Sequence, residues 1–452
     1  MFRLGAVCLA LLHLAKAIFP WEPGWLMSLA STAVLVPGLF LISPGFKKAT
    51  LVFLTLGIGL LAFTRQPVAA WISAWNSMTN TIAIMVAMQT ISIPVAMGRY
   101  DGAIRRWAER RFRSGRSLFV FSTLITHVLT SFLMLGVIPF SMTLLGGTIK
   151  ARAREPDRFL AAAISRGYVL AALWAPGAIN LYLVVQATGV AWSAILLPGI
   201  VLALLGLGLS LWMETGKMGV LRDPELLGNP VDEYSVRDSS AIRDVLIAAS
   251  AIVGMVLILE HFGIGSGYTR IMLTGCAAAV VWTLILFNKE NFKLAAKDYW
   301  NEGLLKVRDM GPFFVAMGIF SGALESSGLL DMAMPAIQAA ASGLGIAAVA
   351  VVPLVIVGLS LVGLHPFITI VLFGKILSRA GMPLPPLTIA LSLAVGGAAS
   401  YMISPFAGII MSISRYTGAK AFEIAIRWNW KFSLAFFGVG VIFALLWGTV
   451  FV

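Results

Sequence analysis

Two stretches of the chain resemble each other at a spacing of about 229 residues. The matched pairs are Val86-Ala87-Met88 with Val315-Ala316-Met317, Pro176 with Pro405, and Thr188-Gly189 with Thr417-Gly418. Between these pairs, residues 136–140 (GVIPF) match residues 363–367 (GLHPF) at an offset of 227. An offset that slips by two and recovers indicates small compensating insertions and deletions within a duplication. A duplicated membrane unit with glycine and proline breaks at matching places points to the substrate site of a transporter.

The composition places this duplication in a lipid bilayer. Hydrophobic residues make up 59% of the 452 residues and charged residues 12%, whereas soluble domains carry about 25% charged residues. The net charge of +13 would suggest nucleic acid for a soluble protein. Here Lys and Arg lie mostly between apolar runs, which favours a positive-inside topology and anionic lipid and argues against nucleic acid. Cys8 and Cys276 lie far apart within apolar runs, so no disulfide framework or metal site is expected.

Apolar runs predict the membrane helices, because about 20 apolar residues span the hydrocarbon core. The expected crossings are 4–20, 24–43, 49–65, 79–97, 160–188, 191–213, 242–262, 268–287, 306–328, 385–414 and 422–451. The segments 214–241 and 288–305 are polar and are expected to be loops. The sequence therefore predicts an all-α polytopic membrane protein with about eleven transmembrane helices.

Two further apolar stretches, 117–149 and 345–380, are too long for one helix and carry glycine and proline near their middle. We interpret each as a re-entrant helical hairpin. The arm before the first hairpin, residues 99–116, contains seven arginines and is predicted to be an amphipathic helix on the cytoplasmic surface. The corresponding arm, residues 329–344, has no Lys or Arg, and an odd number of crossings between the copies places it outside. The duplication is therefore predicted to be an inverted repeat.

The chain divides into four parts on this interpretation. They are N-terminal extra membrane helices at 1–48, a first repeat at 49–213 with hairpin 117–149 and broken helix 160–188, a cytoplasmic linker and connecting helix at 214–267, and a second repeat at 268–452 with hairpin 345–380 and broken helix 385–414.

Interrupted backbone at membrane depth is tolerated only where protein buries it or where it lines a watery cavity. Four places qualify, namely the two hairpin turns and the proline breaks in helices 160–188 and 385–414, where proline frees backbone carbonyls. Freed carbonyls suit a small cation, and half-helix N-termini present N–H groups to an anion. The alternative is a helix kink filled by packing, but four breaks in two matching pairs favour a binding site. The expected substrate- and ion-binding residues are Thr130, Ser131, Pro176, Gly177, Asn180, Gly358, Ser360, His365, Ser400, Ser404 and Pro405.

These features resemble the ion transporter superfamily, which includes the divalent anion:sodium symporters and the arsenite-efflux and NhaD-type permeases. Members carry Ser-Asn-Thr at each hairpin tip and a Leu-Pro-like step some eight residues later. Here Ser131 and Gly358 each lie eight residues before Pro139 and Pro366. The resemblance covers roughly residues 49–213 and 268–451. It implies a scaffold of hairpins and broken helices, with Na⁺ as a candidate ion at the hairpin tips.

Three ionisable residues fall inside predicted membrane segments, where such groups are functional hypotheses. His127 precedes the first tip and His365 follows the second, and either is a candidate proton relay or anion contact, or else a neutral packing residue. Arg166 is a candidate for neutralising an anionic substrate, or else it extends to the inner surface.

The sequence therefore predicts an inner-membrane, multi-pass secondary transporter, not an enzyme. It would move an organic or other small anion by alternating access, driven by Na⁺ or H⁺, without a cofactor. Partners are membrane lipid and the anionic solute, and a homodimer is compatible with the sequence. The alternatives are a subunit of a larger membrane complex and an integral membrane transferase or flippase for lipid-linked anions.

Overall fold

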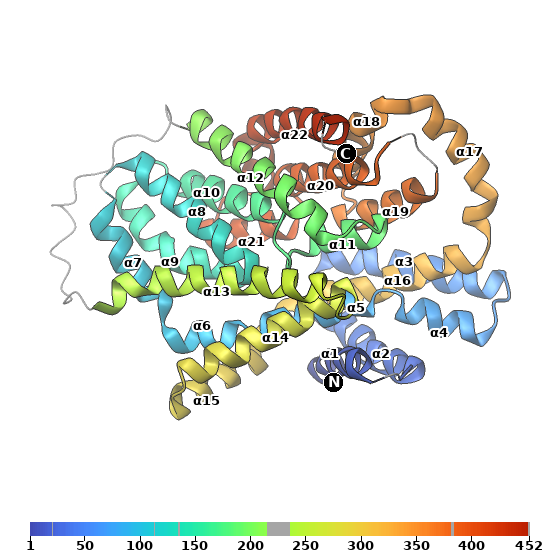
Figure 1. Ribbon diagram of the computed structural model, residues 1–452, viewed down its shortest axis with the longest axis horizontal. Coiled ribbons are helices and arrows are strands. Elements are labelled where there is room, and N and C mark those ends of the chain that lie inside the picture. Colours follow the sequence, from blue (N-terminus) through green and yellow to red (C-terminus); the bar gives the residue numbers. More distant parts are fainter. Residues whose placement is uncertain (20, 113, 134–135, 215–235, 381–383, 451–452) are drawn as a thin grey trace. The chain divides into compact units, whose positions relative to one another are not determined.

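The structure is a computed structural model, which describes residues 1–19, 21–112, 114–133, 136–214, 236–380 and 384–450. This described part of the chain is helical throughout and contains no strand, in agreement with the expected all-α membrane protein (Figure 1). Ten of its segments are long and apolar enough to cross a membrane by length and composition. Three expected crossings, at 4–20, 160–188 and 306–328, are not among these ten segments, because their helices are shorter than 18 residues.

Contacts divide the chain into two compact units, and each unit takes segments from both halves of the sequence. Unit 1 comprises Met1–Met97, Gly254–Leu344 and Arg379–Met382, and unit 2 comprises Gly98–Val253, Gly345–Ser378 and Pro383–Val452. Helix α13 (Val236–His261) begins in unit 2 and ends in unit 1.

Unit 1 is built from ten α-helices besides its part of α13. They are α1 (Phe2–Ile18), α2 (Gly24–Leu41), α3 (Pro44–Phe63), α4 (Val68–Asn76), α5 (Thr79–Gln89), α6 (Ser92–Gly98), α14 (Gly267–Ile285), α15 (Lys289–Asp298), α16 (Met310–Ser326) and α17 (Leu329–Leu344). Short π and 3₁₀ turns at Tyr299–Gly303 and Leu304–Val307 connect α15 to α16.

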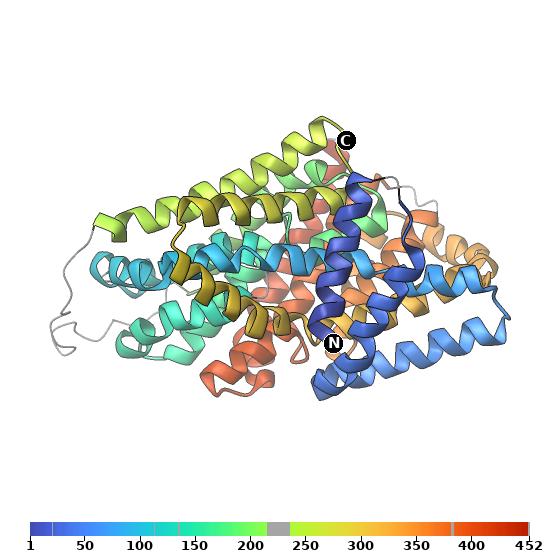
Figure 2. The same cartoon turned by 90° about the horizontal axis from the view of Figure 1, so that it is seen from below.

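Small residues set the helix spacing in unit 1, as is usual where helices approach closely in a membrane. A Cβ on Gly57 of α3 would lie 2.8 Å from the backbone nitrogen of Phe320 on α16. On the same helix, a Cβ on Gly322 would lie 2.7 Å from the Cβ of Ala74 on α4. Helix α1 packs against α2 and α5 (Figure 2). The core of unit 1 is therefore arranged around α16.

Unit 2 contains most of the segments for which the hairpins and broken helices are predicted. Its helices are α7 (Tyr100–Arg111), α8 (Gly115–Leu133), α9 (Val137–Arg152), α10 (Pro156–Ala171), α11 (Ile179–Thr188), α12 (Trp192–Glu214), α18 (Ala348–Leu361), α19 (Pro366–Arg379), α20 (Pro386–Ile403), α21 (Gly408–Thr417) and α22 (Trp430–Val450). A π turn at Glu423–Trp428 precedes α22. Helix α20 packs between α18 and α22, and it also contacts α10 and α11.

The two broken helices repeat in detail. The second halves, α11 and α21, are ten residues long and begin after Ala178 and Ala407. They end at Gly189 and Gly418, whose φ angles of 71° and 78° lie in the left-handed region that glycine adopts without strain. Both pairs of positions are 229 residues apart, which is the spacing found in the sequence. The local structure therefore repeats along with the sequence.

Three expectations about local structure are wrong. Residues 288–305 are not a loop, because helix α15 begins at an N-cap in which Asn288 Oδ1 accepts a hydrogen bond from the Asn291 backbone N–H at 3.1 Å. The residues expected at the two hairpin tips also lie inside helices. Thr130 and Ser131 are still inside α8, and Gly358 and Ser360 are still inside α18.

The hydroxyl groups explain the error about the turns. Thr130 Oγ1 donates to the Thr126 carbonyl at 2.7 Å, and Ser360 Oγ donates to the Val357 carbonyl at 2.8 Å. Such bonds satisfy the hydroxyl within the helix, so these residues do not need a turn. The second turn lies instead at Gly363, whose φ is 101°.

Helix α12 packs against the first helix break. The Trp192 indole N–H donates to the Trp174 carbonyl at 3.0 Å. A Cβ on Gly199 would collide with the Leu173 carbonyl oxygen and lie 3.1 Å from the Cβ of Trp174. On the same helix, a Cβ on Gly208 would meet no atom within 4 Å.

We predict that Gly199→Ala destabilises the protein by about 1–3 kcal/mol, because the added methyl group overpacks against backbone. Gly208→Ala should be neutral or stabilising by up to about 1 kcal/mol, since alanine is the better helix former. Thermal unfolding of both variants in detergent tests this pair. Equal unfolding temperatures would contradict the close approach of α12 to the break.

Candidate functional site

A small enclosed cavity lies where the two broken helices meet the two predicted hairpins. Its volume is about 10 Å³, which is roughly the space that one water molecule needs. It is lined by Thr130 of α8, Tyr168, Val169 and Ala172 at the end of α10, Ala178, Ile179 and Asn180 at the start of α11, Phe367 of α19, and Ala398 and Tyr401 of α20. Two of the expected site residues, Thr130 and Asn180, therefore line the same cavity.

Polar groups without protein partners face this cavity. Asn180 is 3% exposed, and neither atom of its amide has a hydrogen-bond partner within the described chain. The Tyr401 hydroxyl is likewise buried with no such partner. The adjacent Ser400 hydroxyl also has no such partner, but Ser400 is not among the residues that line the cavity. A buried polar group that lacks a hydrogen bond costs about 1–3 kcal/mol. These groups therefore form a polar site that packing alone does not explain.

The breaks place Asn180 and Tyr401 at the cavity. Asn180 lies in the first turn of α11, directly after the break at 172–178 that contains Pro176 and Gly177. Both of these residues are buried. A Cβ on Gly397 of α20 would collide with Asn180 Oδ1. Only glycine at position 397 therefore lets α20 lie against this side chain.

The second break is tied to the second predicted hairpin. Ser404, the residue after α20, donates its hydroxyl to the Ser360 carbonyl at 2.8 Å. Ser404 and Ser360 are both buried, and Pro405 beside them is half-buried. Gly358, in contrast, is exposed. The structure therefore brings Ser360 and Ser404 together and leaves Gly358 outside the site.

The two histidines take different places. His127 Nε2 accepts a hydrogen bond from the Trp174 indole at 2.9 Å, so this ring nitrogen carries no proton. His365 Nδ1 accepts from the Phe367 backbone N–H at 3.3 Å, at the start of α19. The His365 ring also packs edge-on against Tyr401, with ring centroids 5.8 Å apart. His365 thus lies beside the cavity, whereas His127 contacts the first break. Ser131 donates to the Val128 carbonyl at 2.7 Å within its own helix.

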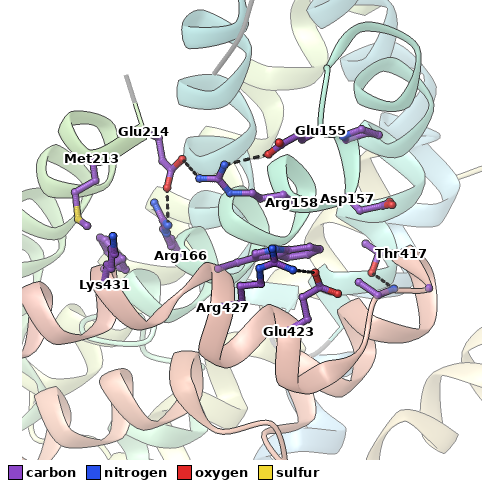
Figure 3. A pocket seen from close by; sticks show the side chains of 15 residues that line it. Glu155, Asp157, Arg158, Arg166, Met213, Glu214, Thr417, Glu423, Arg427 and Lys431 are labelled. Atoms are coloured by element: carbon purple, nitrogen blue, oxygen red, sulfur yellow. Dashed lines mark hydrogen bonds and ion pairs between the residues drawn. The ribbon is translucent and has the colours of Figure 1, made fainter. Parts of the chain in front are cut away.

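A second, larger pocket of about 740 Å³ lies elsewhere in unit 2 (Figure 3). Charged side chains line it from α10 and the residue before it, from the end of α12, and from the start of α22 and the segment before it. The charged lining residues are Glu155, Asp157, Arg158, Arg166, Glu214, Glu423, Arg427 and Lys431. Residues Thr417–Ala419, at the end of the second broken helix, also line it. Both broken helices therefore reach this pocket.

Arg166 lies at the buried side of this pocket. It is 1% exposed, and its Nη2 donates to Glu214 Oε1 at 2.9 Å. Its Nη1 donates to Ser210 at 3.2 Å, and its Nε donates to Asn429 Oδ1 at 3.4 Å. The guanidinium also lies 4.5 Å from the centre of the Phe432 ring. Arg166 therefore does not extend into water but is held by α12 and by residues next to α22.

Sequence reasoning missed Tyr401, Glu214 and Asn429. Glu214 is the last residue of an apolar run and looks like an ordinary helix end. Asn429 is 263 residues away from Arg166. Only the fold brings these residues together.

No metal site is formed among the described residues, where no group of three or more His, Cys, Asp or Glu side chains is close enough to hold an ion. Cys8 and Cys276 are free thiols. The lining of the enclosed cavity consists of hydroxyl, amide and apolar groups.

Two solved transporter structures share this fold. The YdaH transporter of Alcanivorax borkumensis matches 88% of this chain and 98% of its own length, with a TM-score of 0.62 and 15% sequence identity. MtrF of Neisseria gonorrhoeae, which is described as illuminating a class of antimetabolite efflux pumps, matches 89% of this chain and 95% of its own length, with a TM-score of 0.60 and 12% identity. No family model and no curated protein matches the sequence. At these identities the likeness shows the fold, and the specific resemblance to divalent anion:sodium symporters stays a prediction.

We predict that Tyr401→Phe stabilises the protein by about 1 kcal/mol, because it removes a buried hydroxyl that has no protein partner. Tyr416→Phe is the matched control, since the Tyr416 side chain is exposed and should change little. Thermal unfolding in detergent measures both. A clear loss of stability in Tyr401→Phe would show that its hydroxyl is satisfied.

The buried ion pair predicts strong coupling between Arg166 and Glu214. Glu214→Leu should cost about 3–5 kcal/mol, because it leaves the buried Arg166 charge without its carboxylate. Arg166→Leu should cost less, because Glu214 keeps Arg158 as a partner at 3.1 Å. The double variant should cost clearly less than the sum of the two. A double-mutant cycle by thermal unfolding measures this coupling, and additive effects would contradict it.

Proposed function

We propose that the protein is a secondary active transporter that moves an organic or other small anion across the membrane by alternating access. The observation that carries the proposal is the enclosed polar cavity at the junction of both broken helices and both predicted hairpins. The likeness in fold to two transporters supports the same class of function, although a fold alone does not establish an activity.

The lining of the cavity supports a small ion at this site. Asn180 supplies both a donor and an acceptor, and the hydroxyl of Tyr401 supplies either. The Thr130 hydroxyl already donates to Thr126 and supplies an acceptor only. A volume of about 10 Å³ suits an ion or a water molecule and excludes an organic solute. Under this proposal the cavity is closed to an organic solute, and the two broken helices would separate to let a solute reach this junction.

Coupling to Na⁺ or H⁺ is part of the proposal. A Na⁺ ion would use the Asn180 and Tyr401 oxygens together with carbonyls freed at the breaks, because Pro176 and Pro405 lack N–H groups. The absence of any carboxylate from the described lining disfavours a site for a strongly charged cation, since burying such an ion needs compensating charge. The transported solute is accordingly proposed to be an anion.

We further propose an inner-membrane location with the arginine-rich arm on the cytoplasmic side. The repeated breaks fit an inverted repeat, in which each copy contributes one hairpin and one broken helix. Membrane lipid would be a partner under this proposal, and a homodimer is compatible with it. A subunit of a larger membrane complex remains the alternative, which stoichiometric co-purification with another chain would favour.

Transport in proteoliposomes tests the proposal. The panel comprises dicarboxylates, aromatic carboxylates and inorganic oxyanions, each measured with a Na⁺ gradient, with a pH gradient and with neither. We expect gradient-dependent movement of at least one anion. Asn180→Ala and Tyr401→Phe should each reduce the rate by about tenfold, which is the effect expected from losing a hydrogen bond of about 1.4 kcal/mol.

Two matched controls accompany this experiment. Asn291→Ala and Tyr416→Phe make the same chemical changes outside the cavity, on α15 and α21, and should leave the rate unchanged. If every anion equilibrates without regard to either gradient, the protein is not a secondary transporter of this kind.

A further inference from the structure

The charged pocket has room for an organic solute, whereas the enclosed cavity does not. Its volume of about 740 Å³ lies within the range of about 300–1,000 Å³ that is usual for small-molecule sites. Helix α10 contributes side chains to both the pocket and the cavity, because Arg166 lines the pocket and Tyr168, two residues later, lines the cavity. A solute in the pocket would therefore contact the same broken helix that forms the cavity.

One carboxylate bridges two guanidinium groups at the buried side of the pocket. Glu214 Oε1 lies 2.9 Å from Arg166 Nη2, and Glu214 Oε2 lies 3.1 Å from Arg158 Nη2. Figure 3 shows these two contacts, together with the bond from Arg158 to Glu155. Hydrogen bonds between guanidinium and carboxylate groups are strong and directional. The pocket thus already contains a complete binding site for a carboxylate, which a side chain of the same chain occupies.

The buried positive charge exceeds the buried negative charge at this place. The side chains of Arg166 and Arg158 are 1% and 25% exposed, and the Glu214 side chain they share is 3% exposed. Glu155, the second partner of Arg158, is 65% exposed, so water and salt screen most of its charge. Two shielded cations therefore share one shielded carboxylate.

Lys431 is a further cation, at the exposed side of the pocket. It lines the pocket, and its ammonium group lies 5.6 Å from the centre of the Trp430 ring. It lies beside Phe432, the residue whose ring contacts Arg166. Glu423 is engaged with Arg427 at 3.4 Å, and Figure 3 draws this pair and Asp157 away from Lys431. An acidic group that enters the pocket is therefore attracted to the end formed by Lys431, Arg158 and Arg166.

We propose that this pocket binds the acidic group of the transported solute, a carboxylate or a phosphate, which competes with the Glu214 carboxylate for Arg158 and Arg166. Lys431 attracts the acidic group, and Glu214 holds the two arginines in place when no solute is bound. That the bound solute is also transported rests on the function proposed above, whereas the binding site itself does not.

Calorimetric titration of the purified full-length protein in an uncharged detergent tests this site. Succinate and inorganic phosphate serve as probes, as choline salts at constant ionic strength. We expect Glu214→Gln to bind the probes at least about tenfold more tightly than the unaltered protein, because the competing charge is gone. Glutamine keeps one acceptor oxygen for Arg166, which limits the loss of stability.

A second variant keeps the test decisive if Glu214→Gln unfolds. Lys431→Gln changes an exposed side chain and should weaken probe binding several-fold, since it removes an attracting charge. Glu290→Gln and Lys293→Gln on α15 are matched controls, because both side chains are exposed and lie outside the pocket. Both controls should bind the probes as the unaltered protein does.

Three results would overturn the site. The first is a folded Glu214→Gln variant with unchanged or weaker affinity, and the second is unchanged affinity in Lys431→Gln. The third is displacement of succinate by phosphatidylglycerol added to the micelles, which would assign the pocket to a lipid headgroup.

The outcome separates this site from the proposed function. If the protein binds succinate in this way but moves no anion in proteoliposomes, the binding site is supported and the transport proposal is rejected. If the protein transports an anion but its Glu214→Gln variant binds the probes no more tightly, the transport proposal is supported and the binding site is rejected.

Discussion

Every backbone polar group at membrane depth needs a partner inside the protein, and the two interrupted helices of unit 2 are where this requirement is hardest to meet. The structure meets it by packing other elements onto the breaks. The Trp192 indole N–H donates a hydrogen bond to the Trp174 carbonyl, and the Ser404 hydroxyl donates one to the Ser360 carbonyl. Gly199 and Gly397 bring α12 and α20 into contact with the first break and with Asn180. The arrangement of unit 2 follows from this covering of the breaks.

The same arrangement separates two kinds of polar chemistry along one helix. Around Tyr168, α10 meets the neutral groups of Asn180 and Tyr401 in a cavity without charge. At Arg166, α10 meets a network of charged groups that opens into a large pocket. A buried ion pair is weak evidence for stability, because its desolvation cost offsets much of its attraction. The binding role proposed for this pocket would account for the position of the pair.

Local sequence patterns were sufficient for part of this structure. Proline at matching positions predicted both helix breaks, because proline cannot continue the hydrogen-bond ladder. The hairpin turns were misplaced by a few residues, because serine and threonine in membrane helices bond to their own helix. Helix α15 was missed, although Asn288 is a recognisable N-cap.

Helix content, the apolar segments and the repeat are properties of short stretches of chain, so the amino-acid order alone decides them. The sites are different. Asn180 and Tyr401 line one cavity although they are far apart in the chain, and Arg166 meets Asn429 across 263 residues. Whether an arginine in a membrane helix extends to water or pairs with a carboxylate depends on which helices surround it. That choice belongs to the tertiary structure, because burial and partners are properties of packing and not of sequence position.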